Sequence, residues 1–529
     1  MERVVIRVSL LVGLLLVTEA VSQQAGAAGE FDPAGASIEQ LHAALISGSI
    51  SDEQLVRYYL DRVQRFDKGD PRINAMLSLN PDAIEQARKA DKALKMKRNM
   101  SVLFGIPFVV KDNFDSVGVP TTAGSAVLAH SMPRTNAFVV QKLLEQGAIL
   151  IGKANMSELA SSYGRLGYSS AGGLTVNPYD TSRDVSGSSS GSAAAIAADF
   201  AAFALGTDTS GSIRGPANVA GLVGLRPTLG LISRSGVVPL SLTFDTVGIL
   251  ARTATDVAVV LDAIAAADAA DAATQARPSS QPHYVDAAVA QNLRGARLGV
   301  VGNFRGANAE IDAAEQGMLE TLSAEGAVLV PVTLPETYEH LWALVMSPVG
   351  QAEFRPQFER YLRTLSAGQP RTLAEFIDAS ASNTDSGRSP INPALLKALR
   401  DAQVTELTDS PTYIHLLTQV IPSLRAELQA LMTTRDLRAL VFSTMSCPAT
   451  PRFDRADSSY VCHSDDSYKA SYIAAVAGFP EVTVPAARLS KNLPAGYSFL
   501  GVPFSEGRLL SLANDFQRAR GRQAGPALR

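Results

Sequence analysis

The chain has 529 residues, of which 46% are hydrophobic and 19% charged, so it has enough apolar material for a large core and too little charge for a disordered polymer. Its 47 basic and 51 acidic residues give a net charge of -4, which provides no basic field for a phosphate backbone and argues against nucleic acid as a partner. The length suits several domains of roughly 150 residues or one large α/β enzyme.

The first 22 residues have the pattern of a signal peptide. Arg3 and Arg7 form a short positive region, Val8–Val17 is an apolar run, and Ala20–Ser22 supplies the small residues that a signal peptidase needs. Cleavage after Ser22 predicts an exported protein, periplasmic or secreted, and an uncleaved anchor is the alternative. The apolar run is shorter than the roughly 20 residues of a spanning helix, and no later segment is long enough, so no membrane embedding is expected after cleavage.

Export would expose Cys447 and Cys462, the only two cysteines of the chain, to an oxidising compartment in which a disulfide persists. The sequence leaves two alternatives open: a bridge between them, or two inert buried thiols.

The N-terminal part of the chain alternates helical and strand-like patterns. Apolar residues recur at helical spacing from Ser37 to about Leu94, which predicts two or three opening helices over about 37–97. Leu103–Val110 and Ala148–Ile151 are short apolar runs typical of buried strands, and helical patterns occupy Ala137–Gln146 and Thr255–Ala265. This alternation predicts an α/β fold whose sheet is covered by helices on both faces.

Further along, residues 266–292 are rich in Ala, Asp, Ser and Pro, which indicates a solvated linker or surface excursion. Residues 340–430 are helix-rich and interrupted by polar stretches, and we expect a helical insertion that covers or shapes a site. Strand-like runs resume at Ala439–Ser443 and Glu481–Pro485, before a closing helix near Leu509–Arg518.

Two familiar kinds of site are absent from the sequence. Gly147–Ala154 is one residue short of a P-loop, because Ala154 stands where a Ser or Thr would ligate magnesium, and its apolar residues indicate a strand. No HExxH motif or Cys/His cluster occurs, so no metal site is predicted. The six histidines are scattered: His42, His130, His283, His340, His415 and His463.

A first Ser/Gly-rich segment formally matches the nucleophile elbow of α/β-hydrolases. Gly187–Gly191 reads GSSSG, but an elbow serine follows a buried strand, whereas Asn177–Asp184 is polar and contains Pro178. A flexible loop is the default alternative. The Ala-rich stretch Ala193–Phe203 that follows has a helical pattern, which weakens that default.

A second Ser/Gly turn has features of an oxyanion site. The turn Thr207–Gly211 runs into Ser212–Arg214, a predicted helix start, where a serine lies beside several unpaired backbone N–H groups. No histidine is near, so a nucleophilic Ser212 needs another base. Lys111, at the end of an apolar strand-like run and followed by Asp112, is the best-placed candidate, because burial depresses the pKa of a lysine and lets its neutral amine accept a proton.

These segments together resemble the amidase signature family of serine hydrolases. The resemblance rests on Lys111-Asp112, on GSSSGS from Gly187 and on GTDTSGSIR from Gly206, with 24 positions from Ser188 to Ser212. It extends from about Ser37 to Phe516 and implies one catalytic domain over 23–529, with a central mixed twisted sheet. Further matching segments are TTAGS from Thr121, GKANM from Gly152, VGLRP from Val223, GFP from Gly478 and GYSFLG from Gly496.

The resemblance implies a Ser-Ser-Lys triad and an acyl-enzyme mechanism without metal or organic cofactor. Ser212 would be the nucleophile and Lys111 the base that begins neutral. Ser188, after a cis peptide with Gly187, would pass the proton between them. The implied oxyanion hole consists of four backbone N–H groups: Thr209, Ser210, Gly211 and Ser212. Four positions resemble supporting residues that brace the turns: Gly187, Ser189, Asp208 and Arg214.

The chain departs from the commoner family pattern at Ser190 and Ser210, where Gly is usual. The change keeps the backbone donors and adds small hydroxyls. These serines, the closing GYSFLG stretch and the predicted export make the chain resemble bacterial peptide amidases most, which release ammonia from C-terminal peptide amides. A small-molecule or peptide amide is therefore the expected partner, and monomer and dimer are both compatible with the sequence.

Several alternatives stay open at this point. An aryl or fatty acyl amide is the alternative substrate, because specificity in this family lies in variable walls, here roughly residues 335–475. Amidotransferase subunits of the tRNA-charging pathway share the triad but work beside a cytosolic partner. A non-catalytic exported binding protein is the alternative of another class. A penicillin-binding or β-lactamase enzyme is excluded, because no S-x-x-K tetrapeptide occurs.

Overall fold

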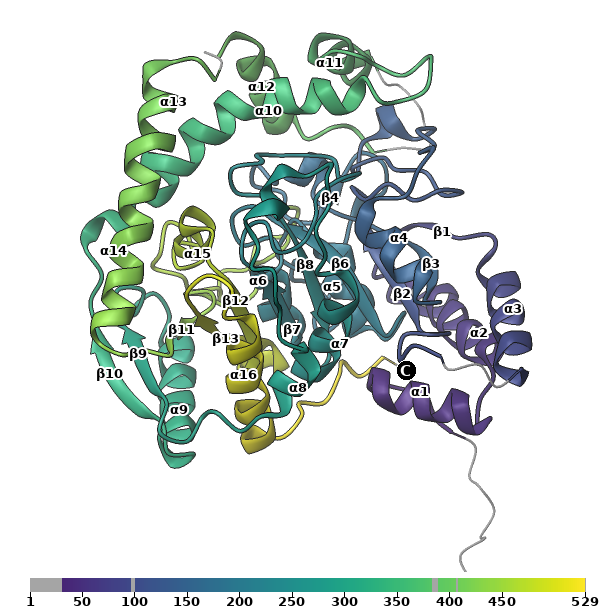
Figure 1. Cartoon of the computed structure of the whole chain (residues 1–529). Coiled ribbons are helices and arrows are strands. Elements are labelled where there is room, and N and C mark those ends of the chain that lie inside the picture. The colour runs from purple at the N-terminus through teal and green to yellow at the C-terminus, as the bar shows by residue number, and fades with distance from the viewer. Residues whose placement is uncertain (1–30, 97–99, 383–388, 406–407, 529) are drawn as a thin grey trace, which may run out of the picture.

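The computed structural model describes residues 31–96, 100–382, 389–405 and 408–528, and the predicted signal peptide lies outside these ranges. Its centre is an 11-stranded mixed sheet of order β1-β3-β2-β6-β8-β7-β12-β13-β11-β9-β10 (Figure 1). The strands of this sheet are β1 Met76–Leu79, β2 Pro107–Lys111, β3 Ile149–Ala154, β6 Phe203–Asp208, β7 Val223–Arg226, β8 Thr246–Ala251, β9 Arg297–Val301, β10 Val328–Val332, β11 Ala439–Ser443, β12 Glu481–Arg488 and β13 Pro494–Leu500. A small hairpin pairs β4 Tyr168–Ser169 with β5 Gly173–Leu174.

Helices cover both faces of this sheet, which confirms the predicted fold class (Figure 1). The α-helices are α1 Ile38–Ser47, α2 Asp52–Arg62, α3 Ala83–Lys95, α4 Phe138–Glu145, α5 Ser190–Ala197, α6 Arg214–Ala220, α7 Ala254–Ile264, α8 Tyr284–Val289, α9 Ala309–Ala324, α10 Ser347–Leu362, α11 Leu373–Ser382, α12 Pro393–Val404, α13 Pro411–His415, α14 Ile421–Thr434, α15 Ser471–Ala477 and α16 Glu506–Arg520.

Alternate residues of the central strands divide the core between the two faces. In β2, Phe108 and Val110 pack with α4, α7 and their neighbours, whereas Val109 packs with α5 and α6 on the opposite face. All these side chains are fully buried. Such two-sided burial explains why the strands appear in the sequence as continuous apolar runs rather than as alternating patterns.

The region expected to be a helical insertion contains helices α10 to α14, which arch over one end of the sheet (Figure 1). Its helices have an apolar cluster of their own, in which Phe354, Phe358 and Phe376 stack and pack edge to face. The same cluster includes Leu159 and Val238, which come from loops outside these helices. The insertion therefore packs against the rest of the protein through apolar side chains.

The neighbouring strands β2 and β6 have their carboxyl ends on the same side of the sheet. These two strands are parallel neighbours, with Phe108 beside Phe203 and Val110 beside Leu205. Parallel neighbours end at the same edge, so Lys111 at the end of β2 is brought near Thr207 and Asp208 at the end of β6.

Some predicted elements differ from the structure. The helix expected over Ala193–Phe203 spans Ser190–Ala197, and Phe203 instead begins β6, because an apolar run buried on all sides has no periodicity that separates helix from strand. The opening region contains three helices as predicted, but also β1, which pairs antiparallel with β3. The supposed linker at 266–292 includes α8, whose Tyr284 and Ala288 are buried.

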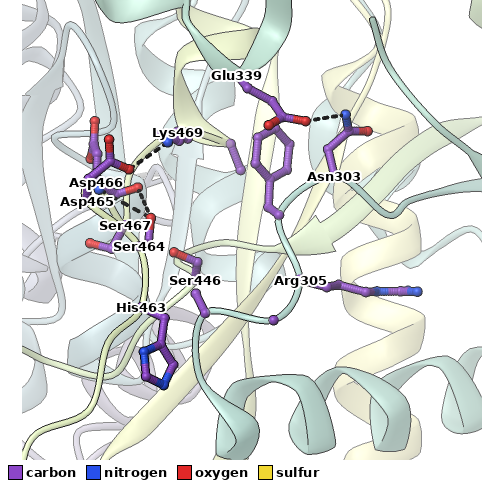
Figure 2. A pocket seen from close by; sticks show the side chains of 14 residues that line it. Asn303, Arg305, Glu339, Ser446, His463, Ser464, Asp465, Asp466, Ser467 and Lys469 are labelled. Carbon is purple, nitrogen blue, oxygen red and sulfur yellow. Dashed lines mark hydrogen bonds and ion pairs between the residues drawn. The ribbon is translucent and has the colours of Figure 1, made fainter. Parts of the chain in front are cut away.

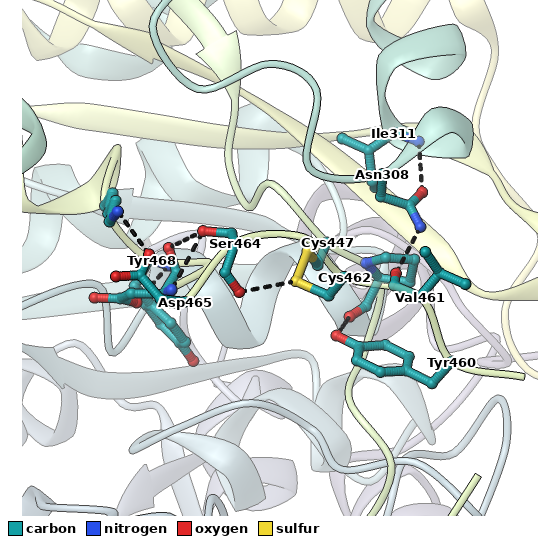
Figure 3. The surroundings of a disulfide bond; sticks show 12 residues. Asn308, Ile311, Cys447, Tyr460, Val461, Cys462, Ser464, Asp465 and Tyr468 are labelled. Atoms are coloured by element: carbon teal, nitrogen blue, oxygen red, sulfur yellow. Dashed lines mark hydrogen bonds and ion pairs between the residues drawn. A yellow bond between two sulfur atoms is a disulfide. The ribbon is translucent and has the colours of Figure 1, made fainter. Parts of the chain in front are cut away.

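Cys447 and Cys462 form a disulfide, which decides between the two alternatives that the sequence left open (Figure 3). Within the described ranges, no helix has both the length and the apolar character needed to cross a membrane.

Candidate active site

Lys111 is the centre of the candidate site and is fully buried. Its Nζ donates hydrogen bonds to Ser188 Oγ at 2.8 Å and to Thr207 Oγ1 at 2.7 Å. Asn113 Nδ2 donates to the same threonine oxygen at 3.1 Å. Thr207 is thereby fixed by two donors, and it holds the lysine amine against the hydroxyl of Ser188.

No ion pair involves Lys111 among the residues that the structure describes. This distinguishes it from Lys153, which is equally buried but lies 3.2 Å from Asp112. Burial lowers the pKa of Lys111 to about 7, although the negative charges of Asp245 and Asp208 favour its charged form. Near neutral pH a substantial share of this amine is therefore neutral and able to accept a proton.

The Ser188 segment approaches the lysine in an unusual backbone conformation. The Gly187–Ser188 peptide bond is cis. Ser189 Oγ donates to the Thr207 carbonyl at 3.1 Å, and Ser189 N donates to the Ser212 carbonyl at 3.2 Å. The two Ser/Gly-rich segments that the sequence singled out therefore lie side by side. Ser190, one of the two departures from the family pattern, donates from Oγ to the Ser186 carbonyl at 2.6 Å.

The turn between β6 and α6 is held by a buried network around Asp208. Its carboxylate accepts hydrogen bonds from Arg214 at 2.8 and 3.0 Å and from Arg226 at 2.8 Å. Arg214 also pairs with Glu481 at 2.7 Å, and all four side chains are fully buried. Although burial favours the neutral acid, the two guanidinium groups hold the pKa of Asp208 well below its usual range.

Backbone N–H groups of this turn are the candidate oxyanion donors, and the structure corrects one of them. Gly211 N–H donates to Asp208 Oδ1 at 3.0 Å, so it is already engaged and leaves the predicted set. Within the described part of the chain, the N–H groups of Thr209, Ser210 and Ser212 have no hydrogen-bond partner. Three donors at the start of a helix remain for a negatively charged oxygen.

A pocket of ≈ 580 Å³ opens beside this turn. Its lining includes Thr209 and Ser210 of this turn together with Trp342 and Phe354. Its remaining described lining is mostly apolar and comes from two core loops and from α10 and α12: Leu159, Ser161, Tyr163, Leu240, Ser241, Phe244, Met346, Ser347, Gly350, Gln351, Leu395, Ala398, Leu399, Asp401, Ala402 and Thr405. Among the described residues that line this pocket, Asp401 is the only Asp, Glu, Lys, Arg or His.

A second, polar pocket of ≈ 210 Å³ lies elsewhere, between residues 303–307 and 463–470 (Figure 2). Its charged groups are largely satisfied within the pocket: Lys469 pairs with Asp465 at 2.6 Å, and Asn303 donates to Glu339 at 2.8 Å. Its described lining contains none of the predicted site residues, and we assign it no chemical role. The described residues also contain no group of three or more His, Cys, Asp and Glu side chains that could hold a metal ion.

Sequence reasoning missed several residues that the structure brings into the site. Thr207 and Asn113 lie within or next to the motifs that were singled out, so their polar side chains beside Lys111 were a usable signal. Arg226 lies in the VGLRP segment, which was noticed without a role. Glu481, more than 260 positions from Arg214, carried no local signal, because only the folded sheet brings β12 to the turn.

This chain is similar to several known proteins over most of its length. Residues 54–510 match a family described as Amidase. A glutamyl-tRNA(Gln) amidotransferase subunit from Thermoanaerobacter pseudethanolicus is 31% identical over 493 residues, covering 93% of this chain and 97% of that protein. The structure of native peptide amidase from Stenotrophomonas maltophilia is 34% identical with a TM-score of 0.83, covering 93% of this chain and 98% of that one. An amidase family protein from Bacillus anthracis is 30% identical with a TM-score of 0.82, covering 93% and 92%.

Proposed function

The chain belongs to the amidase signature family and is an enzyme acting on amide C–N bonds, and on that premise we propose that it hydrolyses C-terminal peptide amides through Lys111, Ser188 and Ser212. The observation that carries the proposal is the buried lysine without a described counter-ion, whose amine contacts Ser188 Oγ. Burying an unpaired amine is costly, so its presence next to a serine favours a chemical role over a structural one.

In the proposed reaction, Ser212 Oγ attacks the carbonyl carbon while its proton passes to Ser188 and the Ser188 proton passes to neutral Lys111. The N–H groups of Thr209, Ser210 and Ser212 stabilise the negative oxygen. When the C–N bond breaks, the relay returns the proton to the leaving nitrogen, and ammonia departs. Water then attacks the acyl-enzyme and loses a proton through the same relay, which releases the acid and regenerates Ser212.

The pocket supports an uncharged, largely apolar substrate. Its described walls contain many apolar side chains, including Phe244, Trp342 and Phe354, but no lysine or arginine. A free C-terminal carboxylate would therefore meet no lysine or arginine among the described lining residues, whereas a neutral carboxamide needs no opposite charge. Together with the similarity to peptide amidase, this favours peptides that end in an amide.

We expect ammonia release to be fastest with a short peptide amide that ends in an apolar residue. The measurement compares kcat/KM for such a peptide amide with a fatty amide, an aryl amide and glutamine. Higher kcat/KM for the fatty or aryl amide would replace the substrate proposal and leave the mechanism in place. Glutamine as the preferred donor would favour the amidotransferase alternative. Binding of these amides without any ammonia release would establish the binding-protein alternative.

We also propose that the protein is exported. Support comes from the signal-like pattern of residues 1–22 and from the disulfide between Cys447 and Cys462, because such bridges persist in oxidising compartments. Expressed with its own N-terminus in a Gram-negative host, the mature protein is expected in the periplasm or medium, with an intact mass that lacks residues 1–22 and two thiol hydrogens. A full-length, reduced protein in the cytosol would contradict export.

A further inference from the structure

One side chain outside every sequence motif contacts both of the loops that carry the proposed serines. Tyr468 lies between the disulfide and α15, and it is partly buried (Figure 3). Its hydroxyl contacts Ser186 Oγ, accepts from the Gly187 N–H at 3.2 Å and lies 3.3 Å from the Gly187 carbonyl oxygen. That carbonyl belongs to the cis peptide bond that precedes Ser188.

These contacts fit the capacity of one phenolic hydroxyl, which donates one hydrogen bond and accepts two. The Tyr468 hydroxyl can donate to the Gly187 carbonyl and accept from Gly187 N–H and Ser186 Oγ–H. These three hydrogen bonds use its full capacity. The phenol therefore fixes the two residues immediately before Ser188 through both backbone and side-chain atoms.

The ring of Tyr468 packs against the other serine segment. A Cβ placed on Gly211 would lie 2.9 Å from Tyr468 Cδ1, and a Cβ placed on Gly215 would lie 2.7 Å from Cε1. Both glycines flank Ser212, and their lack of a side chain is what lets the ring approach the backbone so closely. One side chain thus spans the Ser188 loop and the Ser212 turn.

Tyr468 is itself held firmly. Its N–H donates to Asp466 Oδ1 at 2.9 Å, and its carbonyl accepts from Ser471 N–H at 2.8 Å. Asp466 also accepts from the Tyr472 hydroxyl at 2.7 Å. Upstream, the Cys447–Cys462 bridge closes a loop that is tied to the Ser188 side of the site, where Asp184 N–H donates to the Thr450 carbonyl at 3.0 Å.

We propose that Tyr468 is a positioning residue for the proton relay: its hydroxyl holds the Gly187–Ser188 segment, and its ring holds the Ser212 turn, at the separation that the relay needs. The inference rests on the proposed relay through Ser188. Tyr468 is not among the described residues that line the substrate pocket, so it acts on the chemical step rather than on substrate binding.

The test is Tyr468→Phe, which keeps the ring and removes the hydroxyl. For a peptide amide we expect kcat to fall about 30-fold with KM changed less than twofold, because small displacements of reacting groups cost up to about 100-fold. The matched control is Tyr338→Phe, which removes a buried tyrosine hydroxyl bonded to the Leu424 carbonyl outside the site and is expected to keep kcat within twofold. Equal melting temperatures of the two variants exclude a difference in folding.

A second measurement separates positioning from a general loss of order. A p-nitrophenyl ester with the same acyl group has a leaving group that needs no proton to depart. In Tyr468→Phe, kcat/KM for this ester should therefore fall less than kcat/KM for the amide. The ester-to-amide ratio of kcat/KM should rise about tenfold. In a Ser188→Ala background, Tyr468→Phe should change the residual rate less than twofold, because its effect passes through Ser188.

The outcomes distinguish this inference from the proposed function. If the wild-type enzyme turns over amides, Ser188→Ala is impaired and Tyr468→Phe is unchanged, then the Tyr468 inference is wrong and the relay stands. Additive losses in the double variant would also overturn it. If Ser188→Ala retains wild-type turnover, the relay itself fails.

Discussion

Replacing Ser212 with alanine is expected to reduce amide turnover by on the order of 10⁵- to 10⁶-fold, the loss typical of removing a serine nucleophile. Ser212 is 7% exposed and lies in the turn before α6, and its N–H is one of three in that turn without described partners. The change removes one small hydroxyl, so the melting temperature should shift by less than about 3 °C. The measurement is ammonia release together with labelling by a fluorophosphonate, which phosphonylates an activated serine with loss of fluoride.

Ser446→Ala is the matched control for that variant. Ser446 is 9% exposed, its hydroxyl has no hydrogen-bond partner among the described residues, and it lines the second pocket rather than the site. It should keep full turnover and full labelling. An alanine at position 212 that still released ammonia at a tenth of the wild-type rate would remove Ser212 from the nucleophile role.

Lys111→Met is expected to lower kcat for amides by about 10³- to 10⁴-fold, the upper part of the range for loss of a general base. Methionine is close in length and apolar, so it fits a site that already excludes water and holds no described counter-ion. Unlike most changes of a buried charged residue, it should leave the free energy of unfolding nearly unchanged or raise it.

Lys153→Met provides the contrast. Lys153 is as deeply buried, but it pairs with Asp112 and donates to Thr121 Oγ1 at 2.9 Å. Removing it leaves a buried carboxylate unpaired, which should cost about 3 to 5 kcal/mol of stability. Thermal unfolding and kcat measured on both variants should therefore separate the two lysines. A Lys111 variant with normal kcat, or one as destabilised as Lys153→Met, would contradict the proposed base.

The same lysine predicts the pH dependence of the wild-type enzyme. Burial lowers the pKa of Lys111 to about 7, and only the neutral amine accepts a proton. The value of kcat/KM should therefore rise about tenfold per pH unit below 7 and level off above about pH 8. Lys111→Met should lose this slope. A wild-type profile that stays flat from pH 5 to 9, with chemistry limiting, would speak against the relay.

Much of the site was accessible from the sequence because its chemistry is concentrated in short motifs. Lys111, Ser188 and Ser212 stand in the recognisable segments KD, GSSSGS and GTDTSGSIR. The structure brings Lys111 to Ser188 and places the Ser188 and Ser212 segments side by side. Residues such as Thr207 and Asn113 were overlooked although they lie next to these motifs, because a hydroxyl or amide in a polar turn has many ordinary roles.

The sequence predicted long elements better than short elements and element boundaries. Ala193–Phe203 and the following apolar residues are buried from all sides, and such a run fits a helix or a strand equally well. The short strand β1 escaped notice between two helical stretches, because four residues give no usable periodicity. Ala-rich and Pro-rich composition likewise hid α8, which becomes stable by packing Tyr284 into the core.

By itself, then, the sequence determined the α/β class, the helix-rich character of residues 340–430 and the family of the enzyme, because these depend on local periodicity and on short motifs. Only the tertiary structure decided that Lys111 has no described counter-ion, that the Gly211 N–H is engaged by Asp208, and that Tyr468 spans both serine segments. The pairing of the two cysteines was decided there as well. Each of these depends on distances between segments far apart in the chain, and burial and electrostatics act through those distances rather than through sequence neighbours.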